Sequence, residues 1–142
     1  MAIGARLLRV EDRPLLTGTA SFVDDLERTD ALEVAFVRSP VAHGRLVDAG
    51  LDRARAVPGV EAAFANEDLG LAPLVPPNTN PGVKVPPQPV LAKDKVRFAG
   101  EPVALIAAVD RYVAEDARDL ALPEIEELEP LTDPRRAISD DA

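Results

Sequence analysis

Residues 94–120, DKVRFAGEPVALIAAVDRYVAEDARDL, decide the fold because a strand pattern, a turn and a helix pattern follow one another there. Val96 and Phe98 alternate with basic residues, and residues 102–109 then run apolar, as strands covered on both faces do. Asp110 is placed to cap the helix that follows. That helix carries a narrow apolar stripe, formed by Val113, Ala114, Ala117, Leu120 and Ala121.

The pair Gly100 and Glu101, between the two apolar runs, raises the question of function. A carboxylate beside a glycine can act in general acid–base chemistry. The same pair can also turn the chain, since Gly100 permits a tight connection, Pro102 begins the buried strand, and Glu101 can pair with a cation such as Arg97. The choice between these interpretations decides whether the chain is a catalyst or a part of one.

Upstream of this stretch, two further strands are predicted before residue 52. Residues 31–40 place Leu32, Val34 and Phe36 on one face and Ala35 with Val37 on the other, which predicts a strand with both faces largely covered. Residues 43–51 predict a second, weaker strand. Both are short enough for a compact domain.

A short helix, a third strand and a helical turn are predicted next. Asp52 is expected to cap the helix, which Pro58 and Gly59 end. Residues 59–65 alternate as a strand does, and Asn66 is the expected cap of a single helical turn over residues 66–70.

Residues 71–92, LAPLVPPNTNPGVKVPPQPVLA, contain seven of the chain's 14 prolines. Each proline removes a backbone donor and fixes φ, so no regular helix or sheet can run through this segment. It is interpreted as a long surface loop or, alternatively, as a proline-rich docking segment.

The two ends of the chain have weaker patterns. Residues 1–25 show no strong period, and an extended segment is expected after a turn at Gly18. Pro123 ends the last long helix, after which a short acidic strand is expected. Because proline lacks a ladder donor, that strand fits an edge position. A turn at residues 132–134 and a final helical turn complete the prediction.

Composition excludes several classes of function. The chain has no cysteine, which removes disulfides, thiolate ligands and iron–sulfur ligation, and a single histidine makes a protein-only zinc site improbable. A net charge of −9 disfavours nucleic acid. No apolar run is long enough to span a membrane, and the N-terminus lacks a secretory signal, so a cytoplasmic protein is expected.

The element pattern predicts an α+β domain with a mixed β-sheet and short helices. It lacks the regular alternation and the phosphate loop of a nucleotide-binding fold. The motifs G-x-G-x-x-G, G-x-S-x-G and H-E-x-x-H, the Walker loop and internal repeats are also absent from the sequence.

Four stretches of the sequence carry a resemblance to a known family. They are RVEDRPLLTGTASFVDDL, LEVAFVRSPVAHGRLV, PGVEAAFANEDLG and LAKDKVRFAGEPVALIAAVDRYVAEDA, and together they cover nearly all of the chain. In order and spacing they resemble the N-terminal α/β hammerhead domain of the molybdenum-binding large subunit of the xanthine dehydrogenase, aldehyde oxidase and aerobic carbon monoxide dehydrogenase family. The resemblance implies one hammerhead-like domain over residues 1–142, with the proline-rich loop at 71–92.

The resemblance also implies an answer for Glu101. In the family the catalytic glutamate lies far downstream, in the part that binds molybdopterin cytosine dinucleotide, and no stretch of this chain matches it. No catalytic, cofactor-binding or metal-binding residue is therefore expected here, and Glu101 is interpreted as a turn or interface residue. The candidate interface residues are Arg38, His43, Arg45, Gly100 and Glu101.

Alternatives remain for the other candidate residues. His43 can serve at the joint with the cofactor-binding part, or simply donate a structural hydrogen bond. Arg38 and Arg45 can bind a partner's carboxylate or lie on a solvated face. The acidic residues of 124–129 suggest a divalent cation, but alternation along a strand spreads them over two faces.

Two functions of different class follow. In the first, the chain is a non-catalytic scaffold of a molybdenum hydroxylase, packed against the molybdopterin-binding region, with iron–sulfur and flavin (FAD) subunits as further partners of the complete enzyme. In the second, it is a stand-alone binding or assembly module that shares the fold. Either way, an exposed apolar or proline-bearing surface is expected, which includes part of residues 71–92 and makes self-association possible.

Overall fold

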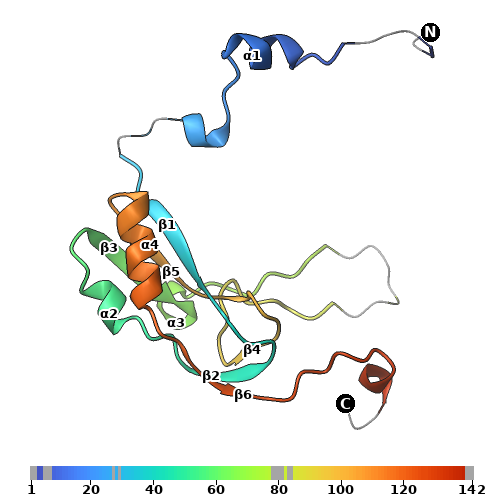
Figure 1. Cartoon of the computed structure of the whole chain (residues 1–142). Coiled ribbons are helices and arrows are strands. Elements are labelled where there is room, and N and C mark those ends of the chain that lie inside the picture. Colours follow the sequence, from blue (N-terminus) through green and yellow to red (C-terminus); the bar gives the residue numbers. More distant parts are fainter. Residues whose placement is uncertain are drawn as a thin grey trace. The chain divides into compact units, whose positions relative to one another are not determined.

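The computed structural model describes residues 3–4, 8–26, 28, 30–77, 82 and 85–139 (Figure 1). The chain divides into two compact units, Met1–Ala31 and Leu32–Ala142.

The described residues of the first unit contain two short helical segments. Helix α1 spans Asp12–Thr17 and ends at Gly18, which adopts the left-handed conformation with φ of 69°. The predicted turn at Gly18 is thus confirmed, but α1 was missed, because six residues are too few to show a helical period. The segment after Gly18 is also not fully extended. It contains the 3₁₀ turn Val23–Asp25, where the Asp25 carboxylate accepts a hydrogen bond from the Phe22 amide at 2.8 Å.

The second unit is built on two antiparallel sheets of three strands each. Sheet A has the order β1-β5-β3, formed by β1 (Glu33–Arg38), β5 (Pro102–Ala108) and β3 (Val60–Ala65). β5, whose sequence is apolar without interruption, takes the central position, with β1 paired to one edge and β3 to the other. The α+β fold is confirmed.

Sheet B has the order β4-β2-β6, formed by β4 (Lys95–Val96), β2 (Gly44–Asp48) and β6 (Glu124–Glu127). The acidic strand β6 lies at an edge, as Pro123 predicted. The two strands on either side of the 97–101 turn belong to different sheets, since β4 pairs with β2 while β5 pairs with β1 and β3.

The described residues of this unit also contain three α-helices and one 3₁₀ turn. They are α2 (Asp52–Arg55), α3 (Asn66–Leu69), α4 (Arg111–Leu120) and the final turn Arg136–Ile138. The predicted caps of α2 and α3 are wrong by one residue: Leu51 and Ala65 hold the cap positions. In α3 the reason is visible, because Asp68 reaches back to accept a hydrogen bond from the Ala65 amide at 2.8 Å.

The predicted cap of α4 is confirmed. The Asp110 carboxylate accepts a hydrogen bond from the Val113 amide at 2.9 Å. Replacing Asp110 by alanine is expected to lower the free energy of unfolding by about 1 kcal/mol, because an amide of the first turn loses its partner. The matched control, Asp116→Ala on the exposed side of the same helix, should change it by less than about 0.5 kcal/mol. Urea denaturation measures both, and equal effects would contradict the capping role.

The core between sheet A and α4 consists largely of alanine. Ala104 and Ile106 of β5 pack with Ala117 and Ala121 of the helix, and Val37 joins them from β1. Small side chains let the helix lie close to the sheet. A second cluster, around Val96 and Val103, joins the two sheets.

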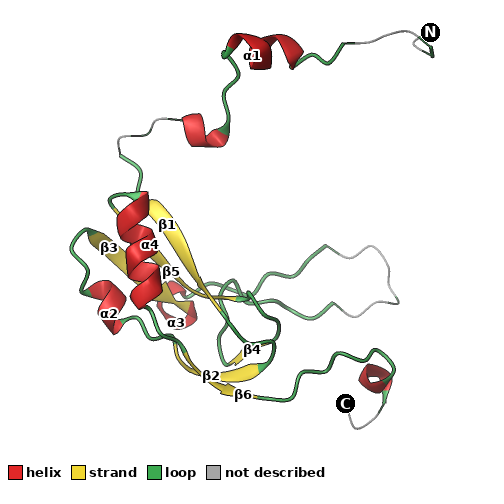
Figure 2. Cartoon of the chain, viewed as in Figure 1, coloured by secondary structure: helices red, strands yellow, loops and turns green. Residues whose placement is uncertain are grey.

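The described residues of the proline-rich segment 71–92 form a loop, as predicted (Figure 2). Its described residues contain one isolated bridge, in which the amides and carbonyls of Leu74 and Gln88 exchange hydrogen bonds of 2.8 Å. Residues 78–81, 83 and 84 lie outside the described residues. Leu71, Leu74 and Val75 are exposed, which confirms the expected apolar surface on this segment.

Candidate functional site

The turn at residues 98–101 connects the two sheets. The Glu101 amide donates to the Phe98 carbonyl at 3.1 Å, and Gly100 has φ of 88°, a conformation that favours glycine. Two further hydrogen bonds join the turn to the end of β1: Gly100 donates to the Ser39 carbonyl at 2.8 Å, and Ser39 donates to the Glu101 carbonyl at 2.9 Å. The glycine is therefore needed for the turn.

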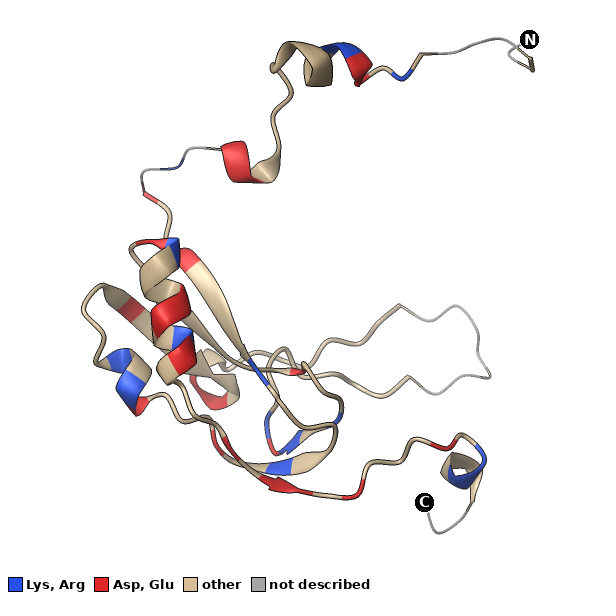
Figure 3. Cartoon of the chain, in the orientation of Figure 1, with Lys and Arg blue, Asp and Glu red and all other residues tan. Residues whose placement is uncertain are grey.

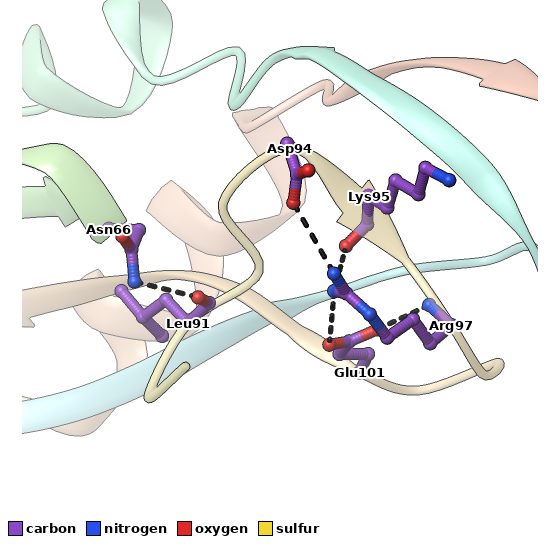
Figure 4. Close-up of polar contacts among 6 residues, drawn as sticks. All are labelled: Asn66, Leu91, Asp94, Lys95, Arg97 and Glu101. Atoms are coloured by element: carbon purple, nitrogen blue, oxygen red, sulfur yellow. Dashed lines mark hydrogen bonds and ion pairs between the residues drawn. The ribbon is translucent and has the colours of Figure 1, made fainter. Parts of the chain in front are cut away.

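The Glu101 side chain is enclosed by its own chain, with only 3% of the residue exposed. One carboxylate oxygen accepts a hydrogen bond from the Arg97 amide, and the other lies 3.8 Å from the Arg97 guanidinium (Figure 4). A buried carboxylate needs such partners to remain charged. The turn interpretation of Glu101, with Arg97 as its cation, agrees with this geometry.

Arg97 also holds the chain that precedes the turn. Its guanidinium donates to the Lys95 carbonyl at 2.9 Å and lies 3.4 Å from the Asp94 carboxylate (Figure 4). A hydrogen bond from its own backbone lowers the pKa of Asp94 below the usual aspartate value; slight desolvation opposes this effect, and the Arg97 guanidinium adds to the lowering. The Asn66 amide group donates to the Leu91 carbonyl at 2.8 Å and fixes the segment just upstream.

Arg38 belongs to the same site as Gly100 and Glu101. Its guanidinium donates to the Gly100 carbonyl at 2.9 Å and lies 5.7 Å from the centre of the Phe36 ring. Such a cation over a ring face is weakly attractive. Arg38 thus braces the turn and borders an aromatic side chain.

Arg45 lies in β2, the central strand of sheet B, and His43 directly precedes this strand. His43 Nδ1 is 3.0 Å from the Glu129 carbonyl, which can only accept, so this nitrogen carries the proton. Arg45 forms an exposed ion pair with Glu126 at 3.4 Å. Arg45 therefore contacts β6 itself, and His43 contacts the segment that follows it.

A shallow cavity of about 380 Å³ lies between His43 and the residues at the start of the turn, Arg97 and Phe98. His43 and Arg97 line it from the polar side, and Phe98 with Leu131 from the apolar side. Arg38, Gly100 and Glu101 thus lie together at the turn, where Arg38 bonds to the Gly100 carbonyl. His43 does not contact them and is linked to the turn only through the cavity that it shares with Arg97. Arg45 is not among the residues that line this cavity.

Charged residues are spread over the surface of the second unit rather than gathered at one point (Figure 3). Among the described residues, no group of three or more His, Asp or Glu side chains is placed to hold a metal ion. Of the glutamates at 124–129, Glu126 pairs with Arg45 and Glu129 pairs with Arg136 at 3.1 Å. Every buried side-chain nitrogen or oxygen in the described part of the chain has a hydrogen-bond partner.

Comparison with known proteins decides the family. Residues 17–129 match the family model described as "Aldehyde oxidase and xanthine dehydrogenase, a/b hammerhead domain". The chain belongs to this family. The resemblance inferred from the four sequence stretches is therefore confirmed, and so is the hammerhead fold.

Two relatives and one solved structure illustrate the match. The chain is 40% identical over 138 residues to the nicotine 6-hydroxylase large subunit of Paenarthrobacter nicotinovorans, which covers 96% of this chain and 17% of the relative. It is 37% identical over 132 residues to the carbon monoxide dehydrogenase large chain of Hydrogenophaga pseudoflava, over 93% of this chain and 16% of the relative. The crystal structure of quinoline 2-oxidoreductase from Pseudomonas putida 86 matches all of this chain and 18% of its own, at a TM-score of 0.88 and 39% identity.

The hammerhead domain is a small part of these proteins, because this chain spans only 16–18% of their length. In the described part of the chain, no helix is long and apolar enough to cross a membrane.

Two features of the site were missed at the level of sequence. Ser39 braces the turn through its backbone, and its hydroxyl donates to the Val41 carbonyl at 2.8 Å. The apolar side of sheet A opposite α4 was also missed. The strand sequences are apolar on both faces, which could have indicated this surface. The sequence pattern alone does not show what covers each face.

Proposed function

We propose that residues 1–142 act as one hammerhead domain that is a non-catalytic scaffold of a molybdenum hydroxylase. The observation that carries this proposal is the enclosed Glu101 carboxylate. The stretch with the most enzyme-like residues uses its acid to hold a turn, so no free general base remains there. The family match over residues 17–129 supports the same assignment.

The complete enzyme would hydroxylate or oxidise a small substrate with water as the oxygen donor. Molybdopterin cytosine dinucleotide would be bound by the rest of the large subunit, and electrons would pass to iron–sulfur clusters and FAD on partner subunits. A cytoplasmic location fits this assembly.

The residues of this chain do not fit a role in holding those groups. The chain has no cysteine for an iron–sulfur cluster, and the Nδ1 atom of its one histidine is bonded to the Glu129 carbonyl. In the described part of the chain, every buried side-chain nitrogen or oxygen already has a hydrogen-bond partner, so none is left unpaired for a ligand. The cofactors are therefore assigned to other parts of the enzyme.

Arg38, His43 and Arg45 are the proposed polar contacts with the cofactor-binding part. Arg45 is exposed, and Arg38 lies at the border of an exposed aromatic side chain. Gly100 and Glu101 would contribute indirectly, by fixing the turn that Arg38 braces.

The test is to purify the tagged protein from its source with everything that remains attached to it. We expect stoichiometric molybdenum and pterin in this preparation, together with a polypeptide region that matches the rest of a large subunit by mass spectrometry. A preparation without molybdenum would defeat the scaffold assignment and favour a stand-alone assembly module.

A further inference from the structure

The face of sheet A that points away from α4 consists of two apolar rows across all three strands. Because directly opposed residues of paired strands point to the same side, the register defines each row. Phe36, Leu105 and Phe64 form one row, and Val34, Ala107 and Ala62 form the other. We call these six residues the open face.

The two faces of sheet A are covered very differently. Ala35, Ala104, Ile106 and Ala108 point toward α4 and are buried. On the open face, Val34 remains 50% exposed and Phe36 41% exposed, whereas Ala62, Leu105 and Phe64 are half-buried and only Ala107 is buried. An antiparallel sheet with one face in water normally carries polar residues on that face. The open face carries none, so its sequence is suited to burial.

The aromatic residues of the chain strengthen this point. It has four phenylalanines and one tyrosine, all of which the structure describes, and none of them is buried. The core is built from alanine and aliphatic residues instead. Aromatic side chains left outside a core are the usual anchors of protein interfaces.

We propose that the open face is the surface on which the cofactor-binding part of the large subunit docks, an inference that rests on the proposed function. The relatives carry more than four-fifths of their length outside this domain, which supplies an occupant. A second copy of this chain fits less well, because each copy carries a net charge of −9 and the two would repel.

The residues at the two edges of the open face indicate that the partner packs on the face and does not add a strand to the sheet. At the outer edge of β3, Arg55 donates to the Ala63 carbonyl at 3.0 Å, which blocks strand addition at this point. At the β1 side, Arg38 lies over the Phe36 ring as a polar rim. The partner therefore packs on the face of the sheet, with an uncharged surface of aliphatic and aromatic side chains.

Two lysine substitutions test this surface in the protein as purified from its source. In Val34→Lys and Phe36→Lys, the methylene stem can lie on the sheet while the charge reaches water, so the free domain should tolerate the change. Once a partner covers the face, the charge becomes buried and unpaired. We expect association to weaken about 30-fold or more for each variant. The control is Tyr112→Lys, at a residue of α4 that is 79% exposed.

Molybdenum per tagged chain is the readout, with circular dichroism of each variant as a check of folding. Wild-type levels in Tyr112→Lys, with loss in the other two variants, support the inference. Equal retention in all three would overturn it and leave the proposed function intact, whereas wild-type protein without molybdenum would defeat the proposed function itself. A wild-type dimer in sedimentation velocity that Phe36→Lys dissociates would overturn it in favour of a second copy.

A measurement without variants covers the case in which a lysine variant does not fold. Hydroxyl-radical footprinting of the wild-type protein, with and without its attached partner, reports side-chain access directly. We expect Phe36 and Phe64 to be protected in the complex and Tyr112 to be oxidised in both states. Equal oxidation of Phe36 in both states would overturn the inference.

Discussion

Replacing Gly50 by alanine is expected to lower the free energy of unfolding by about 4 kcal/mol. Gly50 has φ of 67°, and a Cβ atom there would lie 2.1 Å from the Leu122 carbonyl oxygen. The Leu122 amide also donates to the Gly50 carbonyl at 3.2 Å, so the two backbones approach each other closely. Backbone strain and backbone overlap both oppose the added methyl group. Urea denaturation followed by circular dichroism measures the loss.

Gly70→Ala separates these two causes. Gly70 also has a positive φ, of 58°, but a Cβ atom there would meet nothing within 4 Å. Only the strain remains, which costs about 1–2 kcal/mol for a single residue. If both variants lost the same stability, the close approach of Gly50 and Leu122 would be disproved.

The second large effect is expected at Glu101. In Glu101→Ala the Arg97 amide loses its acceptor inside the protein, and we expect a loss of about 2–3 kcal/mol. Glu101→Gln keeps an oxygen acceptor of the same shape and should lose about 1 kcal/mol. Because the role of Glu101 is structural, turnover per bound molybdenum in the complete enzyme should remain at the wild-type level for Glu101→Gln.

The pair of readouts distinguishes structure from catalysis. Stability is measured on the isolated domain by urea denaturation, and turnover is measured on the complete enzyme and normalised to molybdenum. A Glu101→Gln enzyme that is stable and loaded but turns over a hundredfold more slowly would make Glu101 a catalytic residue.

Local patterns were enough to predict most of the strands and the long helix. The alternation in β1 and β3, the apolar run of β5 and the cap at Asp110 are all properties of a few consecutive residues. The errors at the other two caps have the same origin, since Asp52 and Asn66 are good capping residues one position too late. At α3, the contact of Asp68 with the Ala65 amide decides that Ala65 rather than Asn66 adopts the extended cap conformation.

Pairing between distant segments could not be predicted. The division into two sheets depends on β4 pairing with β2, some fifty residues earlier, rather than with the adjacent β5. The same limit applies to the site. The Arg97 and Glu101 contact follows from their spacing, whereas the braces from Arg38 and Ser39 join residues about sixty positions apart.

The prediction that β1 has both faces largely covered is where sequence and structure differ most. The α4 side is covered by Ala114 and its neighbours, but Val34 and Phe36 on the other side remain exposed. The physical reason is that an apolar pattern indicates that a strand face is buried, but it does not indicate which segment or partner covers that face. The open face is the apolar surface of sheet A that no other segment of the described chain covers.

The molybdenum content of the isolated 142-residue chain tests the central claim most directly. The chain would be expressed in cells that make the molybdenum cofactor, purified without partners, and analysed by plasma mass spectrometry and pterin fluorescence. A folded scaffold that lacks the cofactor site predicts a molybdenum level no higher than that of an unrelated protein from the same cells. One molybdenum per chain, with pterin, would contradict it.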